Sequence, residues 1–202
     1  MSTIECKIKW PLLLITAIML VSFVIETPQT ISDFKLKNTN GTIVSLKDYP
    51  KAKGFIIVFT CNHCPFAKLY PNRLNELNKK YKIANVPLIA ICSTDTNIYA
   101  EDVYAKMIGK ATAENFTFPY LCDGDQHVGR NFSAQKTPHA FVIWKENGKW
   151  TIEYNGAIDD NGAEPDKVKQ QYVANAVDEL LKGRSVSVKE IKSIGCQIHY
   201  RK

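Results

Sequence analysis

The chain alternates short apolar runs with longer amphipathic segments, a pattern typical of an α/β protein. Residues 55–60 and 86–91 are continuous runs rich in β-branched and aromatic side chains, which indicates two buried strands. Between them, the apolar side chains of residues 65–81 fall near one face of a helix, which predicts an amphipathic helix. Because a helix connects the two strands, we expect them to lie parallel in one sheet.

Two further segments are typical of β-hairpins. Residues 34–46 contain two strand-like pieces around the turn Asn38 to Gly41, and a second pair of short strands flanks the turn Glu146 to Lys149. Together these elements predict an α/β domain over residues 27–182, with a central mixed sheet flanked by helices. The remaining expected elements are strands at 118–121, 140–144 and 150–154, helices at 101–114 and 166–181, and a short helical segment at 126–132.

Residues 1–26 have the layout of an export signal or a membrane anchor. Lys7 and Lys9 precede an apolar run from Trp10 to Ile25, and polar sequence follows. The run is short for a membrane span and long for a cleaved signal, and no Ala-x-Ala cleavage site follows it. We therefore expect an uncleaved anchor with the domain in the periplasm or cell envelope, and a removed signal peptide with a secreted soluble domain is the alternative.

The formal net charge of +6 is concentrated near the end of the chain. Residues 182–202 hold six Lys or Arg side chains against the single acid Glu190, so the rest of the chain is close to neutral. A nucleic-acid-binding domain is expected to carry a broad basic face, so we do not expect a nucleic-acid partner. We expect residues 183–202 to form a basic C-terminal tail that packs on or near the domain.

The strongest chemical signal is Cys61-Asn62-His63-Cys64-Pro65, which follows the first apolar strand directly. Two cysteines separated by two residues can form a disulfide, and the N-terminus of a following helix favours a thiolate. Cys61 is therefore the expected nucleophile and Cys64 the resolving thiol. His63, if protonated, would further stabilise the Cys61 thiolate.

A lone CxxC is also half of a zinc site, but zinc needs two more ligands. Cys92, Cys122 and Cys196 are single and scattered, so we expect neither a structural metal nor an organic cofactor, only a redox-active disulfide. A second signal is Thr137-Pro138, placed just before the strand at 140–144, where a proline can be cis.

The strand, the CxxC, the following helix and the later Thr-Pro resemble the thioredoxin fold. More narrowly, residues 59–66 (Phe-Thr-Cys-Asn-His-Cys-Pro-Phe) resemble the redoxin or AhpC/TSA-type group, which is peroxiredoxin-like and TlpA-like, and so do residues 118–121, 156–160 and the tail 193–196 (Ser-Ile-Gly-Cys). The resemblance covers about residues 30–200. It implies that Thr137-Pro138 is a cis-proline loop beside Cys61, with Thr60, Asn62, His63, Pro65, Thr137 and Pro138 in supporting roles.

The chain departs from the patterns of these groups at several positions. Typical peroxiredoxins carry P-x-x-x-T-x-x-C, which neither cysteine fits, and thioredoxins carry a buried Asp where this chain has Phe55. Lys136 and His139 flank the Thr-Pro in place of the usual residues, which adds a positive charge and a candidate base or ligand. Cys196 resembles the late cysteine of the group, and it either exchanges with the active-site pair or sits in a tail that packs down.

Three functions follow from these residues. The first is an exported thiol–disulfide oxidoreductase that uses Cys61 and Cys64, with extracytoplasmic thiol or disulfide proteins as partners and an upstream thiol electron donor. The second is a thiol-dependent peroxidase with antioxidant activity. The third is a copper-binding chaperone or assembly factor that uses Cys61, Cys64 and His139, because soft thiolates suit Cu(I).

Overall fold

The structure is a computed structural model that describes residues 29–202, so the expected N-terminal segment lies outside the described residues. Its central strand is β4 (Gly54–Phe59), which is buried along its whole length. β4 runs parallel to β5 (Leu88–Cys92) and antiparallel to β8 (His139–Glu146). The predicted mixed sheet and the parallel pairing of the two apolar runs are therefore confirmed.

The other strands extend this sheet on both sides, in the order β1-β9-β8-β4-β5-β6-β2-β3. Both predicted hairpins are present: β2 pairs with β3, and β8 pairs with β9 through a turn in which Asn147 and Gly148 have positive φ angles. A separate small sheet joins β7 to β11, close to the C-terminus. The bounds of these strands are β1 Thr30–Ile31, β2 Lys35–Asn38, β3 Ile43–Ser45, β6 Tyr120–Cys122, β7 Lys136–Thr137, β9 Lys149–Gly156, β10 Glu190–Ile191 and β11 Cys196–Gln197.

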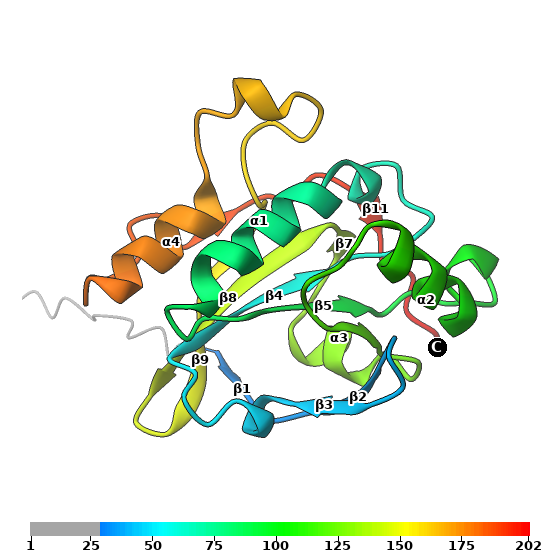
Figure 1. Cartoon of the computed structure of the whole chain (residues 1–202), viewed down its shortest axis with the longest axis horizontal. Helices are drawn as coiled ribbons and strands as arrows, with labels where there is room; N and C mark the ends of the chain where they lie inside the picture. The colour runs from blue at the N-terminus through cyan, green and yellow to red at the C-terminus, as the bar shows by residue number, and fades with distance from the viewer. Residues whose placement is uncertain (1–28) are drawn as a thin grey trace, which may run out of the picture.

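Side chains of β4 alternate between two hydrophobic clusters, one on each face of the sheet. Ile56 and Val58 face the cluster that contains α1 (Pro71–Lys82) and α4 (Tyr172–Leu181), whereas Phe55, Ile57 and Phe59 face the cluster built with β1–β3 and α3 (His127–Asn131). Figure 1 shows α1 and α4 on one side of the sheet, with β1–β3 on the other and α2 (Tyr104–Ala113) near the C-terminus. The two faces matter for the site, because Cys61 and Cys64 belong to the first cluster.

The helix expected over residues 65–81 begins later than predicted. After Cys64 the chain forms a 3-10 helix over Ala67–Leu69, and α1 begins at Pro71. Proline lacks an N–H and disfavours helical backbone at the residue before it, so it is suited to the first position of a helix and not to the interior. The cysteine motif therefore does not sit at the N-terminus of α1.

Two other helices are also shorter than expected. α2 begins at Tyr104, after a 3-10 helix over Ala100–Asp102, and α4 begins at Tyr172. The residues before α4 form a long loop that rises above α1 and α4 in Figure 1. Arg73 of α1 holds the base of this loop through hydrogen bonds to Asp159, Asn161 and Gly162.

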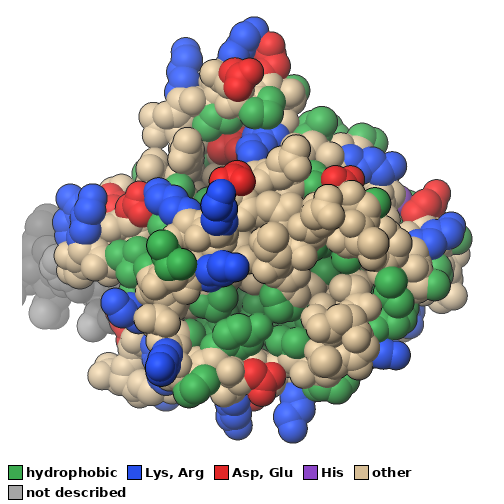
Figure 2. Space-filling model, in the orientation of Figure 1, with side chains coloured by type: hydrophobic (Ala, Val, Ile, Leu, Met, Phe, Trp, Pro, Cys, Tyr) green, Lys and Arg blue, Asp and Glu red, His purple; other side chains and the backbone are tan. Residues whose placement is uncertain are grey.

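The surface drawn in Figure 2 has Lys and Arg side chains scattered over it, with hydrophobic side chains in a hollow between α1 and the β2–β3 hairpin. Within residues 29–202, no helix is both long and apolar enough to cross a membrane.

Candidate active site

The two cysteines of the CxxC lie just beyond the end of β4 and are fully buried. Thr60 connects them to the sheet, because its backbone N–H donates to the Ile91 carbonyl of β5 over 2.9 Å. Thr60 and Thr137 are also buried. The pair is thus fixed to the core and shielded from solvent in this reduced state.

The cis-proline loop lies directly against both sulfur atoms. The Thr137-Pro138 peptide is cis, the Thr137 Oγ1 lies 3.2 Å from the Cys61 Sγ, and the Cys64 thiol donates to the Thr137 carbonyl over 2.9 Å. The juxtaposition that the resemblance implied, a cis proline beside Cys61, is present. Thr137 contacts both cysteines and joins them to the loop between β7 and β8.

The C-terminal tail brings a third cysteine to the same place. β11 pairs antiparallel with β7 so that Cys196 lies opposite Thr137, and the backbone N–H of Cys196 donates to the Cys64 Sγ over 3.4 Å. Cys196 is partly exposed, unlike the other two. The tail therefore lies over the cysteine pair.

The two buried thiols differ in acidity. The hydrogen bond from the Cys61 side chain lowers the pKa of Cys64, and hydrogen bonds from Cys196 and the Ala67 backbone act in the same direction against the effect of burial. The pKa of Cys61 is raised, first by its hydrogen bond to Cys64 and then by burial and the nearby Asp102 carboxylate. Of the two thiols, Cys64 is thus the more acidic.

The assignment of the thiolate to Cys61 stays a prediction, but the structure changes the premise behind it. That expectation placed Cys61 at a helix N-terminus, but α1 begins at Pro71 and the backbone donor of the first helical turn, Ala67, acts on Cys64. Cys64 is also no less exposed than Cys61, since both are fully buried.

Asp102 is a buried carboxylate that organises the CxxC loop, and sequence reasoning did not identify it. Its two oxygens accept four hydrogen bonds: from the backbone N–H groups of Asn62 (2.7 Å) and His63 (3.2 Å), from His63 Nδ1 (2.6 Å) and from the Thr94 hydroxyl (2.6 Å). The Asp102 side chain has no exposed surface. A buried charge is stable only when it is paired and fully hydrogen-bonded, and these four donors meet that condition.

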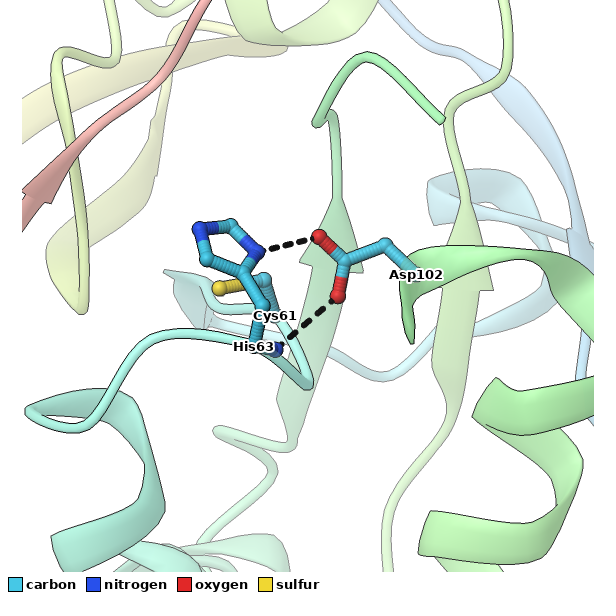
Figure 3. A group of neighbouring side chains, drawn as sticks. All are labelled: Cys61, His63 and Asp102. Atoms are coloured by element: carbon cyan, nitrogen blue, oxygen red, sulfur yellow. Dashed lines mark hydrogen bonds and ion pairs between the residues drawn. The ribbon is translucent and has the colours of Figure 1, made fainter. Parts of the chain in front are cut away.

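His63 is held in place from several sides. Its ring stacks on Tyr99 with 3.7 Å between centroids and 3° between planes, and its Nδ1 faces Asp102. Figure 3 shows this ring beside the Cys61 sulfur, with Nδ1 turned toward the carboxylate. Its Nε2 is buried without a hydrogen-bond partner among the described residues. His63 thus has one ring nitrogen engaged with Asp102 and one without a partner among the described residues.

The other predicted site residues differ in their contacts and in their exposure. Asn62 is well connected, because its side chain donates to the Glu101 carbonyl and accepts from the Tyr120 hydroxyl over 3.0 Å. Pro65 is exposed and Pro138 is buried. Lys136 lies in β7 opposite Gln197 of the tail, and its positive charge lowers the pKa of Cys196, whose pKa is nevertheless raised overall to about 11 by burial and by Cys64.

His139 does not join the cysteines, so the copper ligand set of Cys61, Cys64 and His139 is not formed among the described residues. It pairs with Phe59 across β4 and β8, and its ring lies 4.4 Å from that of Phe141 in the second cluster, on the opposite face from the cysteines. Its Nδ1 accepts from the Gln135 N–H and its Nε2 lies 3.3 Å from the Asn155 Oδ1. The alternation of side chains along β8 is the reason: His139 and Phe141 point the same way.

Metal binding at the cysteines would have to use different residues. Ligand atoms of Cys61, His63 and Asp102 lie within 4.8 Å of one another. However, both carboxylate oxygens of Asp102 and the Nδ1 of His63 are already engaged in hydrogen bonds that hold the loop. The donor set therefore fits a loop-organising role better than a metal centre.

Nothing in the local sequence distinguishes Asp102 from its neighbour Glu101. Both fall in a segment that reads as the start of a helix, yet Asp102 is buried and Glu101 is exposed. The local sequence likewise does not indicate that Tyr99 stacks on His63. These contacts join residues about forty positions apart, so only the fold brings them together.

The fold and the buried cysteine pair beside a cis-proline loop define an oxidoreductase of the thioredoxin-like class. The sequence pattern of the AhpC/TSA family matches residues 28–154, and the chain belongs to this family. The comparison with curated proteins gave no match.

Solved structures support the same fold. An uncharacterized conserved protein from Geobacillus kaustophilus is 32% identical with a TM-score of 0.78, over 86% of this chain and 92% of that one. A hypothetical protein from Sinorhizobium meliloti is 27% identical with a TM-score of 0.78, over 86% and 94%. The peroxidoxin BcpB from Mycobacterium tuberculosis is 19% identical with a TM-score of 0.52, over 64% and 83%, which shows similarity of fold. The predicted thioredoxin-like fold is confirmed.

Proposed function

We propose that this protein is an exported thiol–disulfide oxidoreductase in which Cys61 and Cys64 cycle between a dithiol and a disulfide. The observation that carries the proposal is the contact of both sulfur atoms with Thr137, together with the lowered pKa of Cys64. A stabilised thiolate next to a protonated thiol is the state from which disulfide exchange proceeds.

The exchange balances without any cofactor. A thiolate of the pair attacks one sulfur of a substrate disulfide, which forms a mixed disulfide and releases one substrate thiolate. The other cysteine of the pair then loses its proton and attacks the sulfur of the first cysteine, which forms Cys61–Cys64 and releases the second substrate thiol. Two electrons pass from the protein to the substrate, and an upstream thiol donor restores the dithiol; the reverse sequence oxidises a substrate dithiol.

The export half of the proposal rests on the sequence of residues 1–26. Its cationic start and apolar run are those of an anchor or signal, and outside the cytoplasm a redox pair depends on partner proteins for its oxidation state. Protease treatment of spheroplasts, from which any outer membrane and cell wall have been removed, tests it: the domain should be digested, or already released, without lysis of the inner membrane. Protection of the domain until that membrane is lysed would contradict export.

The redox proposal is tested with a peptide disulfide as substrate and release of free thiol as the readout. Cys61→Ser and Cys64→Ser should each abolish turnover, because either change leaves one thiol that cannot complete the exchange. Cys122→Ser is the matched control, since Cys122 is a partly exposed thiol on β6 that contacts neither member of the pair. Retention of turnover in either active-site variant would overturn the proposal.

The same variants separate the peroxidase alternative. A thiol-dependent peroxidase would consume hydrogen peroxide faster than it reduces the peptide disulfide, with a sulfenic acid formed first at one cysteine. We expect the opposite order of rates.

A further inference from the structure

The C-terminal tail places Cys196 next to the active-site pair. β11 occupies the backbone edge of β7, so Cys196 and Thr137 are opposite each other, and the Cys196 N–H reaches the Cys64 Sγ. The two thiols also affect each other's ionisation, because Cys196 helps to lower the pKa of Cys64 and Cys64 helps to raise that of Cys196. Cys64 therefore has a thiol neighbour on each side, Cys61 and Cys196.

The tail is anchored in this position by contacts along its length. Gly195 passes so close to the Thr137 carbonyl that a Cβ there would clash with the oxygen. Beyond Cys196, the Ile198 N–H donates to the Gln135 carbonyl over 2.8 Å and the Ile198 side chain is buried. The Tyr200 hydroxyl donates to the Ala134 carbonyl over 2.7 Å. Cys196 is thus held beside Cys64 by residues on both sides of it.

The three cysteines differ in their exposure to solvent. Cys61 and Cys64 have no exposed surface, whereas Cys196 is partly exposed and follows Ile194, which is 70% exposed. Among these three thiols, Cys196 is therefore the one that a partner thiol or disulfide meets first.

We propose that Cys196 is a third redox-active thiol that exchanges with Cys64 and relays disulfide exchange between the buried pair and partner thiols. This inference rests on the proposed Cys61–Cys64 redox pair. It assigns Cys196 as a catalytic residue, and it makes the tail part of the active site.

The relay balances in atoms and electrons. Starting from the Cys61–Cys64 disulfide, the Cys196 thiolate attacks the Cys64 Sγ, the Cys64–Cys196 bond forms, and Cys61 leaves as a thiolate that takes up the proton Cys196 lost. A thiolate of a partner dithiol then attacks the Cys196 Sγ and expels Cys64 as a thiolate. The partner's second thiolate attacks the partner sulfur of this mixed disulfide, which releases the partner disulfide and the Cys196 thiol. The partner has lost two electrons and the protein has gained them.

The ionisation of Cys64 and Cys196 favours the second step of the relay. A thiol with a low pKa is a good leaving group, and the pKa of Cys64 is lowered by its neighbours, whereas that of Cys196 is raised. Attack on a Cys64–Cys196 disulfide is therefore expected at the exposed Cys196 sulfur, with Cys64 as the leaving thiolate. The same steps in reverse carry electrons outward.

Disulfide mapping in a Cys61→Ser variant of the full chain tests the relay. After oxidation with one equivalent of diamide and alkylation of free thiols, peptide mass spectrometry should find Cys64–Cys196 as the main disulfide. Cys61→Ser with Cys122→Ser should give the same bond, and Cys61→Ser with Cys196→Ser should give no intramolecular disulfide. If Cys64 and Cys196 both remain alkylated in Cys61→Ser, the relay is wrong.

A rate measurement adds a readout that a structural role would not produce. With dithiothreitol as the dithiol, the oxidised Cys196→Ser variant should be reduced about tenfold or more slowly than wild type, whereas Cys122→Ser should match wild type. An unchanged or faster rate in Cys196→Ser would show that the tail is only a cover. Wild-type protein that forms no Cys61–Cys64 disulfide would instead overturn the proposed function, so the two failures are distinguishable.

Discussion

The backbone N–H of Cys196 donates a hydrogen bond to the Cys64 Sγ over 3.4 Å, although 132 positions separate the two residues along the chain. This contact places the end of the polypeptide on the active-site motif. The Cys196 side chain also helps to lower the pKa of Cys64, and both members of the pair are fully buried. The tail thus lies where it affects the pKa of Cys64 and the exposure of the cysteine pair.

The unequal ionisation of the pair predicts how its reduction potential depends on pH. The pKa of Cys64 is lowered to about 4 and that of Cys61 is raised above its ordinary value, so between about pH 5 and 8 the reduced pair holds one proton. The disulfide holds none. The midpoint potential should therefore fall by about 30 mV per pH unit over this range, and not by the roughly 59 mV expected when two protons accompany two electrons.

Equilibration with glutathione buffers at several pH values measures this slope. A slope of about 59 mV per pH unit throughout would show that both cysteines are protonated in the reduced state.

Replacement of Asp102 should destabilise the protein and change the ionisation of Cys61. Asp102→Asn removes the charge that accepts four hydrogen bonds in the core, with an expected cost of about 3 kcal/mol in the free energy of unfolding. The carboxylate also raises the pKa of Cys61, so its removal should lower that pKa. Urea unfolding and thiolate absorbance against pH measure the two effects.

Asp125→Asn is the matched control for this change. Asp125 also accepts from a histidine Nδ1, that of His127 over 2.6 Å, but its side chain is 73% exposed. We expect a change in stability within about 0.5 kcal/mol and no change in thiolate absorbance. Equal effects of the two substitutions would show that burial of Asp102 has no special role.

Gly195→Ala should displace the tail from the cis-proline loop. The added Cβ would meet the Thr137 carbonyl, which belongs to rigid backbone, so we expect a cost of about 1–3 kcal/mol and faster alkylation of Cys61 and Cys64 by iodoacetamide. Gly109→Ala in α2 is the control, since nothing lies within 4 Å of its Cβ position. Unchanged alkylation in Gly195→Ala would contradict the role of the tail as a cover.

His139 should make the stability of the protein depend on pH. Burial lowers its pKa below 6.5, and the Gln135 N–H donates to its Nδ1, which favours the neutral ring. Glu190 acts in the opposite direction, and Lys136 and Lys192 line the same cavity. Because the folded-state pKa is depressed, the neutral ring stabilises the fold above pH 6.5, and this contribution is lost as the pH falls through the folded-state pKa.

Urea unfolding between pH 7 and 5 measures this dependence. Each pKa unit of depression corresponds to about 1.4 kcal/mol, and His139→Asn should remove that part of the slope. An equal slope in wild type and variant would assign the dependence to other groups.

Much of the fold was predictable from local patterns in the sequence. The runs at 55–60 and 86–91 are strands because continuous β-branched and aromatic residues are suited to a sheet buried on both faces, and the turns at Asn38 and Asn147 carry the residues that hairpins need. The predicted start of the first helix was wrong by several residues. The helix begins at Pro71, and a proline is itself a signal for the first position of a helix.

The sequence by itself determined the redox motif, because two cysteines three positions apart and a Thr-Pro before a strand are local features. Tertiary structure alone decided what surrounds them: Asp102 under the loop, Cys196 on Cys64, and His139 on the opposite face of the sheet. Local patterns specify elements, whereas the pairing of β11 with β7 and the alternation of side chains along β8 depend on contacts between distant segments. The acidity and the burial of Cys61 and Cys64 depend on those contacts, because they decide which groups surround each sulfur atom.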